Sequence, residues 1–302
     1  MTLTFILSLL FTFSLSSDST KTDTPSASYG EMLEKGVSAF YETRWDEAST
    51  IFDEMKRKSP EDPRAYFFES MIPFWEYFFV HQKEELANEF LEISEVAVNF
   101  SEMELVENPD DTTLVLMLSG LHGYRSLVAA GEKEYRTAIQ SGVTGFKYTR
   151  RLLSLDSERP DAQIGRGMFY YMMGSVPREA RWLTNMFGVK GDVEMGFDEI
   201  KKAAESESAV SNDAMMMLMY LYDKEERYEE ALVYADRLTE KFPENVIFHY
   251  KKGQIYEKKG NVDSAVKSFN QVILLDNSYL MDLKELSKHH IEELRNVSMV
   301  LD

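Results

Sequence analysis

The chain has 302 residues, of which 44% are hydrophobic and 13% aromatic, so it can bury a core and is not disordered throughout. Its formal charge of −19 argues against nucleic acid as a partner and against a polybasic attachment to anionic membranes, because like charges repel. It contains no cysteine, which excludes disulfides, thiolate catalysis and cysteine-ligated metal sites.

The N-terminal segment has the pattern of a secretory signal peptide. An apolar run over residues 3–15 is too short to span a bilayer comfortably, and small residues follow it. We expect a signal peptide over residues 1–17, with an uncleaved anchor as the alternative, and a polar linker over residues 18–28. The mature protein is then expected outside the cytosol, in the periplasm if the source is bacterial, without strong membrane association.

Three segments share one spacing of small residues, aromatic residues and a terminal proline. The positions are Gly36, Ala48, Phe52 and Pro60 in residues 29–62; Tyr222, Ala231 and Pro243 in residues 212–245; and Gly253, Tyr256, Ala265 and Phe269 in residues 246–279. The pattern resembles the tetratricopeptide repeat (TPR) family, in which each repeat is a pair of antiparallel helices.

The physical reason for this spacing is close packing of two helices. Small residues let the helices approach, the aromatic ring is expected to fill the gap toward the next unit, and proline ends the second helix. One such hairpin cannot bury its apolar face alone, so hairpins must stack. The sequence therefore predicts an all-α fold, a single right-handed α-solenoid of TPR-like hairpins over residues 29–302, closed by a capping helix over residues 280–296.

The central residues 63–211 keep helical periodicity but lose the repeat spacing, which predicts degenerate hairpins with longer helices. Two strongly apolar runs border or interrupt this region, an aromatic run at residues 66–79 and a methionine run at residues 214–222. Both are expected in the core; the alternative is a groove for a lipid or a hydrophobic peptide at the aromatic run, and a methionine-rich binding surface at the methionine run.

Residues 174–190 form an insertion between two expected helices, 161–173 and 191–204. Gly196 occupies the small position of the second helix. The run MMGSVPREARWLTNMFGVKGDVEMGFDEI resembles a proline-then-G-F-x-G-D element of a eukaryotic TPR-like family of mitochondrial and inclusion-body clearance proteins. The insertion is either a joint between helices or an element that binds a partner.

The segment 136–190 is basic in an otherwise acidic chain, with nine cations against four anions, whereas the rest of the chain carries −24. These cations either pair with acidic faces of neighbouring helices or form a surface for an anionic partner, such as a carboxylate-bearing peptide, a glycan or a lipid headgroup. The residues hypothesised to bind a partner are Arg150, Arg151, Arg178, Arg181, Trp182 and Lys190.

Recognisable catalytic chemistry is absent from the sequence. The five histidines are scattered, no metal-binding or nucleophile motif is present, and we assign no catalytic residue, metal or cofactor. The leading expectation is a non-enzymatic extracytoplasmic TPR scaffold that binds a protein or peptide on its concave face, with the oligomeric state open. The alternative is a helical-repeat enzyme or carrier for an anionic glycan or lipid that uses the basic segment.

Overall fold

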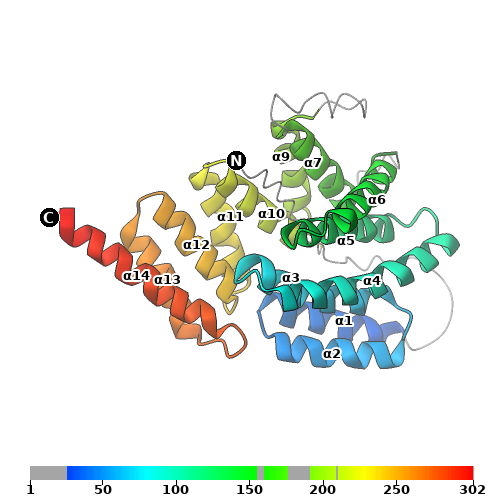
Figure 1. Cartoon of the computed structure of the whole chain (residues 1–302), viewed down its shortest axis with the longest axis horizontal. Helices are drawn as coiled ribbons and strands as arrows, with labels where there is room; N and C mark the ends of the chain where they lie inside the picture. Colours follow the sequence, from blue (N-terminus) through cyan, green and yellow to red (C-terminus); the bar gives the residue numbers. More distant parts are fainter. Residues whose placement is uncertain (1–25, 155–159, 176–190, 209, 302) are drawn as a thin grey trace. The chain divides into compact units, whose positions relative to one another are not determined.

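The computed structural model describes residues 26–154, 160–175, 191–208 and 210–301, and all regular structure within these ranges is helical (Figure 1). This confirms the predicted all-α class. The helices are α1 (Ser26–Tyr41), α2 (Trp45–Lys58), α3 (Pro63–Phe79), α4 (Glu84–Glu107), α5 (Thr112–Gly131), α6 (Tyr135–Ser154), α7 (Pro160–Gly174), α9 (Val193–Ala204), α10 (Ser211–Lys224), α11 (Tyr228–Lys241), α12 (Val246–Lys258), α13 (Val262–Leu275) and α14 (Met281–Leu301). The predicted signal peptide and most of the predicted linker lie outside the described residues.

The helices divide into two compact units. Unit 1 holds the described residues of 61–74 and 83–217, and unit 2 holds 26–60, 75–82 and 218–301. In unit 1, α4, α5, α6, α7 and α9 pack in sequence order; in unit 2, α1 packs on α2, and α11 to α14 pack in sequence order. That residues 29–302 form one right-handed array stays a prediction.

Helix lengths separate the regular repeats from the central region. Helices α4, α5 and α6 have 24, 20 and 20 residues, whereas α10 to α13 have 13 or 14. The longer helices expected over residues 63–211 are therefore found in α4 to α6, whereas α9, in the same region, has only 12 residues. The capping helix α14 begins one residue after the expected start and continues to Leu301. No helix in the described part of the chain has both the length and the apolar character needed to cross a membrane.

In unit 2 the hairpins close by the packing of a glycine against an aromatic ring, whereas the spacing predicts a ring that fills the gap toward the next hairpin. A Cβ added at Gly36 would lie 2.5 Å from Phe52 Cε1, and one at Gly253 would lie 2.7 Å from Phe269 Cε1. A side chain at either glycine would therefore require the ring, or the helix that carries it, to shift. The rings therefore fill space inside their own hairpin. Phe269 also stacks on His290 of the next helix, with ring centroids 4.8 Å apart.

The other repeat positions lie in the core or at helix ends. Ala48, Ala231 and Ala265 are fully buried, Tyr222 is 1% exposed, and Tyr256 is partly exposed. Helices α2 and α11 end just before the prolines of their repeats, at Lys58 and Lys241. The sequence spacing thus marks the hairpin geometry correctly in these repeats.

The expected hairpin around the insertion forms in unit 1. A Cβ at Gly196 of α9 would lie 2.8 Å from the carbonyl oxygen of Gly167 in α7, so the two backbones touch. The backbone N–H of Asp192 donates to the carbonyl of Tyr170 at 3.1 Å. Residues 176–190, the main part of the insertion, lie outside the described residues.

The aromatic and methionine runs belong to the core. Phe67, Phe68 and Trp75 are at most 1% exposed, and Met215 and Met219 are at most 4% exposed. Neither run lines an open groove with these side chains. The aromatic side chains of residues 66–79 therefore contribute to core packing.

Candidate functional site

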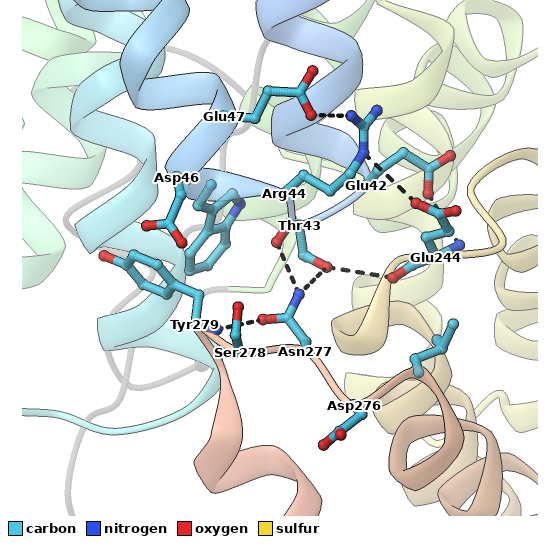
Figure 2. A pocket seen from close by; sticks show the side chains of 12 residues that line it. Glu42, Thr43, Arg44, Asp46, Glu47, Glu244, Asp276, Asn277, Ser278 and Tyr279 are labelled. Atoms are coloured by element: carbon cyan, nitrogen blue, oxygen red, sulfur yellow. Dashed lines mark hydrogen bonds and ion pairs between the residues drawn. The ribbon is translucent and has the colours of Figure 1, made fainter.

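Three turns of unit 2 meet around a cavity of about 490 Å³ (Figure 2). They are the α1–α2 turn at residues 42–44, the α11–α12 loop at 242–245 and the α13–α14 loop at 276–280. The cavity, which we call the turn cavity, is lined by Glu42, Thr43, Arg44, Trp45, Asp46, Glu47, Glu244, Leu275, Asp276, Asn277, Ser278 and Tyr279. The first TPR-like hairpin thus contacts the loops that follow later hairpins of the chain.

Thr43 connects the three turns. It is fully buried and has a φ of 54°, a left-handed conformation that is unfavourable for a β-branched residue. Its hydroxyl donates to the carbonyl of Glu244 at 3.4 Å, and the side-chain amide of Asn277 donates to the Thr43 carbonyl at 2.9 Å. Hydrogen bonds from two loops therefore hold this strained turn in place.

Asn245 provides a second connection between turns. Its side-chain oxygen accepts from the Phe248 N–H at 2.8 Å and caps the N-terminus of α12. Its amide nitrogen donates to the carbonyl of Tyr41, at the end of α1. The C-terminal turn of a helix has carbonyl groups without partners inside the helix. One buried side chain therefore caps the N-terminus of α12 and donates to such a carbonyl at the C-terminus of α1.

The turn cavity is strongly acidic, with five carboxylates against one guanidinium. Arg44 lies between Glu47 and Glu244 and forms ion pairs with both (Figure 2). Asp276 pairs with Lys284 at 2.5 Å. Burial raises the pKa of Glu42, and this outweighs the hydrogen bond that its carboxylate accepts from the Glu244 N–H.

One wall of the turn cavity is aromatic. Tyr279 is 40% exposed and contacts the fully buried Trp45 edge to face, with centroids 5.2 Å apart. An aromatic wall with carboxylates suits cations, but four of the five carboxylates already have partners in unit 2. The contacts around the turn cavity therefore serve first to hold the three turns together.

The residues predicted to bind a partner fall in unit 1 or outside the described part of the chain. Arg178, Arg181, Trp182 and Lys190 all lie in the segment 176–190, which is not described. Arg150 is exposed on α6. Arg151 is half-buried and donates to the carbonyl of Pro109, in the α4–α5 loop. Whether these six residues act together stays a prediction.

The described cations of the basic segment divide into two groups. Arg166 of α7 is paired internally, since its guanidinium contacts Glu199 of α9 at 2.8 and 3.1 Å. Arg136, Lys147 and Arg150 instead lie on the exposed face of α6, and none has an ion pair within the described residues. Internal pairing thus accounts for Arg166, whereas these three α6 cations face solvent.

The buried face of α6 carries a different chemistry. His122 of α5 stacks on Tyr148 of α6 with centroids 5.8 Å apart, and the Tyr148 hydroxyl donates to Glu102 at 2.8 Å. Neither ring nitrogen of His122 has a hydrogen-bond partner in the described structure. Burial, with a smaller contribution from nearby Arg125, lowers the pKa of His122 to about 4, so the ring is neutral at pH 7.

Sequence reasoning missed the turn cavity, although one signal was available. Asn277 stands 34 residues after Pro243, at the equivalent position of the next repeat, where an amide replaces the usual helix terminator. That replacement supplies the donor to Thr43. Among the residues that the structure describes, no group of three or more potential metal ligands is found.

Comparison with known families agrees with this architecture. Residues 161–301 match the family described as Iml2/Tetratricopeptide repeat protein 39, which confirms the resemblance seen around residues 172–200. The match covers somewhat less than half of the chain and includes α7 to α14. No curated protein matches the chain. A TPR-like helical-repeat fold indicates a role in protein interaction.

Proposed function

We propose that the chain is a non-enzymatic scaffold that binds a protein or peptide partner on the concave face of its stacked hairpins. The observation that carries this proposal is the TPR-type packing at Gly36–Phe52 and Gly253–Phe269, which builds rigid hairpins. A rigid repeat surface loses little conformational entropy when a partner binds. The family match over residues 161–301 supports the same role.

The proposal includes a location outside the cytosol, supported by the signal-like residues 1–17. The alternative of an enzyme or carrier for an anionic glycan or lipid has less support. Arg166 and Arg151, two of the cations on which it depends, are engaged by Glu199 and by the Pro109 carbonyl. A ligand would have to compete with these contacts.

Site-specific photo-crosslinking of the full chain in native extract tests the scaffold proposal. A photoreactive amino acid replaces exposed apolar residues one at a time, at Met103 and Val143 in unit 1 and at Leu274 and Met281 in unit 2. We expect a discrete protein to crosslink from some of these positions and to be displaced by excess unlabelled chain. Crosslinks to no protein at any position, or only to glycan or lipid, would contradict the proposal.

A further inference from the structure

The exposed face of α6 carries a stripe of positive charge. Arg136, Gln140, Val143, Lys147 and Arg150 are all exposed and follow one another at intervals of four and three residues, which places them on one side of the helix. At 1.5 Å per residue the stripe is roughly 20 Å long. The opposite face is buried, so the stripe is the solvent side of an amphipathic helix.

The composition of α6 explains why these cations lack internal partners. The helix YRTAIQSGVTGFKYTRRLLS contains no aspartate or glutamate, so within it no carboxylate stands three or four residues from a cation, and Glu132, four residues before Arg136, lies outside the helix. Elsewhere in unit 1, exposed cations have such neighbours, as in the pairs Lys201–Asp198 and Lys202–Glu199. In a chain with 52 acidic residues, an acid-free helix with an exposed basic face is unusual.

We propose that this α6 face, formed by Arg136, Val143, Lys147 and Arg150, binds an acidic segment of a protein partner. The inference rests on the proposed scaffold function and names the chemistry of the partner. Carboxylates spaced along the segment pair with the three cations. Val143, which is 53% exposed and lies between them, provides an apolar contact near the middle of the stripe.

Charge complementarity favours a short acidic segment over a membrane. At physiological salt an exposed charge is screened within about 8 Å, so a peptide lying along α6 experiences mainly the local positive field. An extended anionic membrane would also face the rest of the chain, which carries a large negative charge. Three cations supply little attraction to offset that repulsion.

The direct test measures peptide binding by fluorescence anisotropy with the full chain. The probe is a short helical peptide with glutamates spaced three and four residues apart and leucines between them. Its matched peptides replace every glutamate by glutamine or by lysine. We expect the glutamate peptide to bind and its affinity to fall as salt rises, and the other two to bind much more weakly. Equal binding of the glutamine peptide, or no binding of the glutamate peptide, would overturn the inference.

Charge reversal locates the interaction. The variant R136E/K147E/R150E is expected to lose roughly tenfold in affinity for the glutamate peptide. A matched control, K35E/K267E/R295E, makes the same change in net charge at exposed cations of unit 2 and should stay within about twofold of wild type. Equal losses in both variants would show that only net charge matters, which overturns the assignment to α6.

Two further arms keep the result interpretable. The milder variant R136Q/K147Q/R150Q, together with circular dichroism of every variant, tests whether a loss of affinity comes from a folding defect. The lysine peptide should bind the charge-reversed chain more tightly than it binds the wild-type chain. Phosphatidylserine vesicles and a sulfated glycan are tested in parallel, and stripe-dependent binding of these without the peptide would overturn the inference. If the photo-crosslinked partner still binds the charge-reversed chain, the α6 assignment fails and the scaffold function stands.

Discussion

The turn cavity of unit 2 and the exposed face of α6 in unit 1 are both charged, but their charged side chains have different neighbours. In the turn cavity, Arg44 and Glu42 both contact Glu244 of another turn, while Glu47 pairs with Arg44 and Asp276 with Lys284 of α14. On α6, Arg136, Lys147 and Arg150 contact no acidic group among the described residues. The first region therefore uses charge to hold repeats together, whereas the second leaves charge available to a partner.

This difference predicts where substitutions affect stability and where they affect binding. A side chain that connects turns contributes to the free energy of unfolding, because its removal leaves buried groups unpaired. An exposed cation without a partner contributes little to folding. Measurements of unfolding in the two units test this difference.

The largest effect is expected at Trp45, which is fully buried and packs against Phe40, Trp75 and Tyr279. Trp45→Ala should lower the free energy of unfolding of unit 2 by about 3–5 kcal/mol, because it leaves a large cavity. Urea denaturation, together with hydrogen exchange of the amides of α1 and α2, measures this loss of unfolding free energy. Tyr279→Ala, at the exposed side of the same contact, should cost only about 1 kcal/mol. Equal costs would show that the aromatic wall is not a packed joint.

The buried face of α6 should be sensitive to pH through His122. The folded pKa of about 4 lies below the unfolded value of about 6.5, so protonation favours the unfolded chain. Stability is full above pH 7 and is lost as the pH falls from about 6.5 towards 4, by up to roughly 3 kcal/mol. Hydrogen exchange of α5 and α6 across this range, compared with His122→Gln, isolates the contribution from other titrating groups. If His122→Gln has the same pH dependence of stability as wild type, His122 does not cause the loss of stability at low pH.

A somewhat smaller effect is expected at Asn245. Asn245→Ala removes the cap of α12 and the donor to the Tyr41 carbonyl, at a cost of about 1–3 kcal/mol to unit 2. Asn245→Asp keeps the capping oxygen but loses the donor, so the two variants separate the contributions. Chemical denaturation of both, compared with wild type, provides the measurement. A loss in Asn245→Ala no larger than that of an exposed surface residue would contradict the role of this side chain as a joint.

The smallest effect on folding is expected from the α6 stripe. Replacing Arg136, Lys147 and Arg150 one at a time by glutamine should change the free energy of unfolding by no more than about 0.5 kcal/mol each. Thermal and urea denaturation measure this directly. A larger loss would show that these cations have internal partners and would remove the contrast with the turn cavity.

Sequence spacing predicted the hairpins well because their contacts are local. Gly36 and Phe52, like Gly253 and Phe269, lie within one repeat, so a fixed spacing encodes their contact. The charge of the basic segment was equally visible, but its pairing was not. Arg166 meets Glu199 across 33 residues, and composition alone does not reveal such a partner.

Apart from the amide at Asn277, the sequence contains no indication of the turn cavity, because the cavity depends on contacts between distant repeats. An array stacked in sequence order makes each repeat a neighbour of the next, whereas the first turn meets loops near the other end of the chain. Thr43 adds a second obstacle. Threonine rarely adopts a left-handed conformation, and no residue type in the α1–α2 turn predicts a positive φ at this position.

The contacts of Thr43 also bear on the order in which the chain folds. The hydrogen bonds that it makes with Glu244 and Asn277 join residues 201 and 234 positions apart, a separation that slows closure through the entropy of the intervening loop. Most of that loop is unit 1, so we expect unit 1 to fold first during synthesis and unit 2 to close only after α12 and α13 have left the ribosome. A chain cut at the end of α11 would contain the whole first repeat and still leave its turn without the partners that Glu244, Asn245 and Asn277 provide.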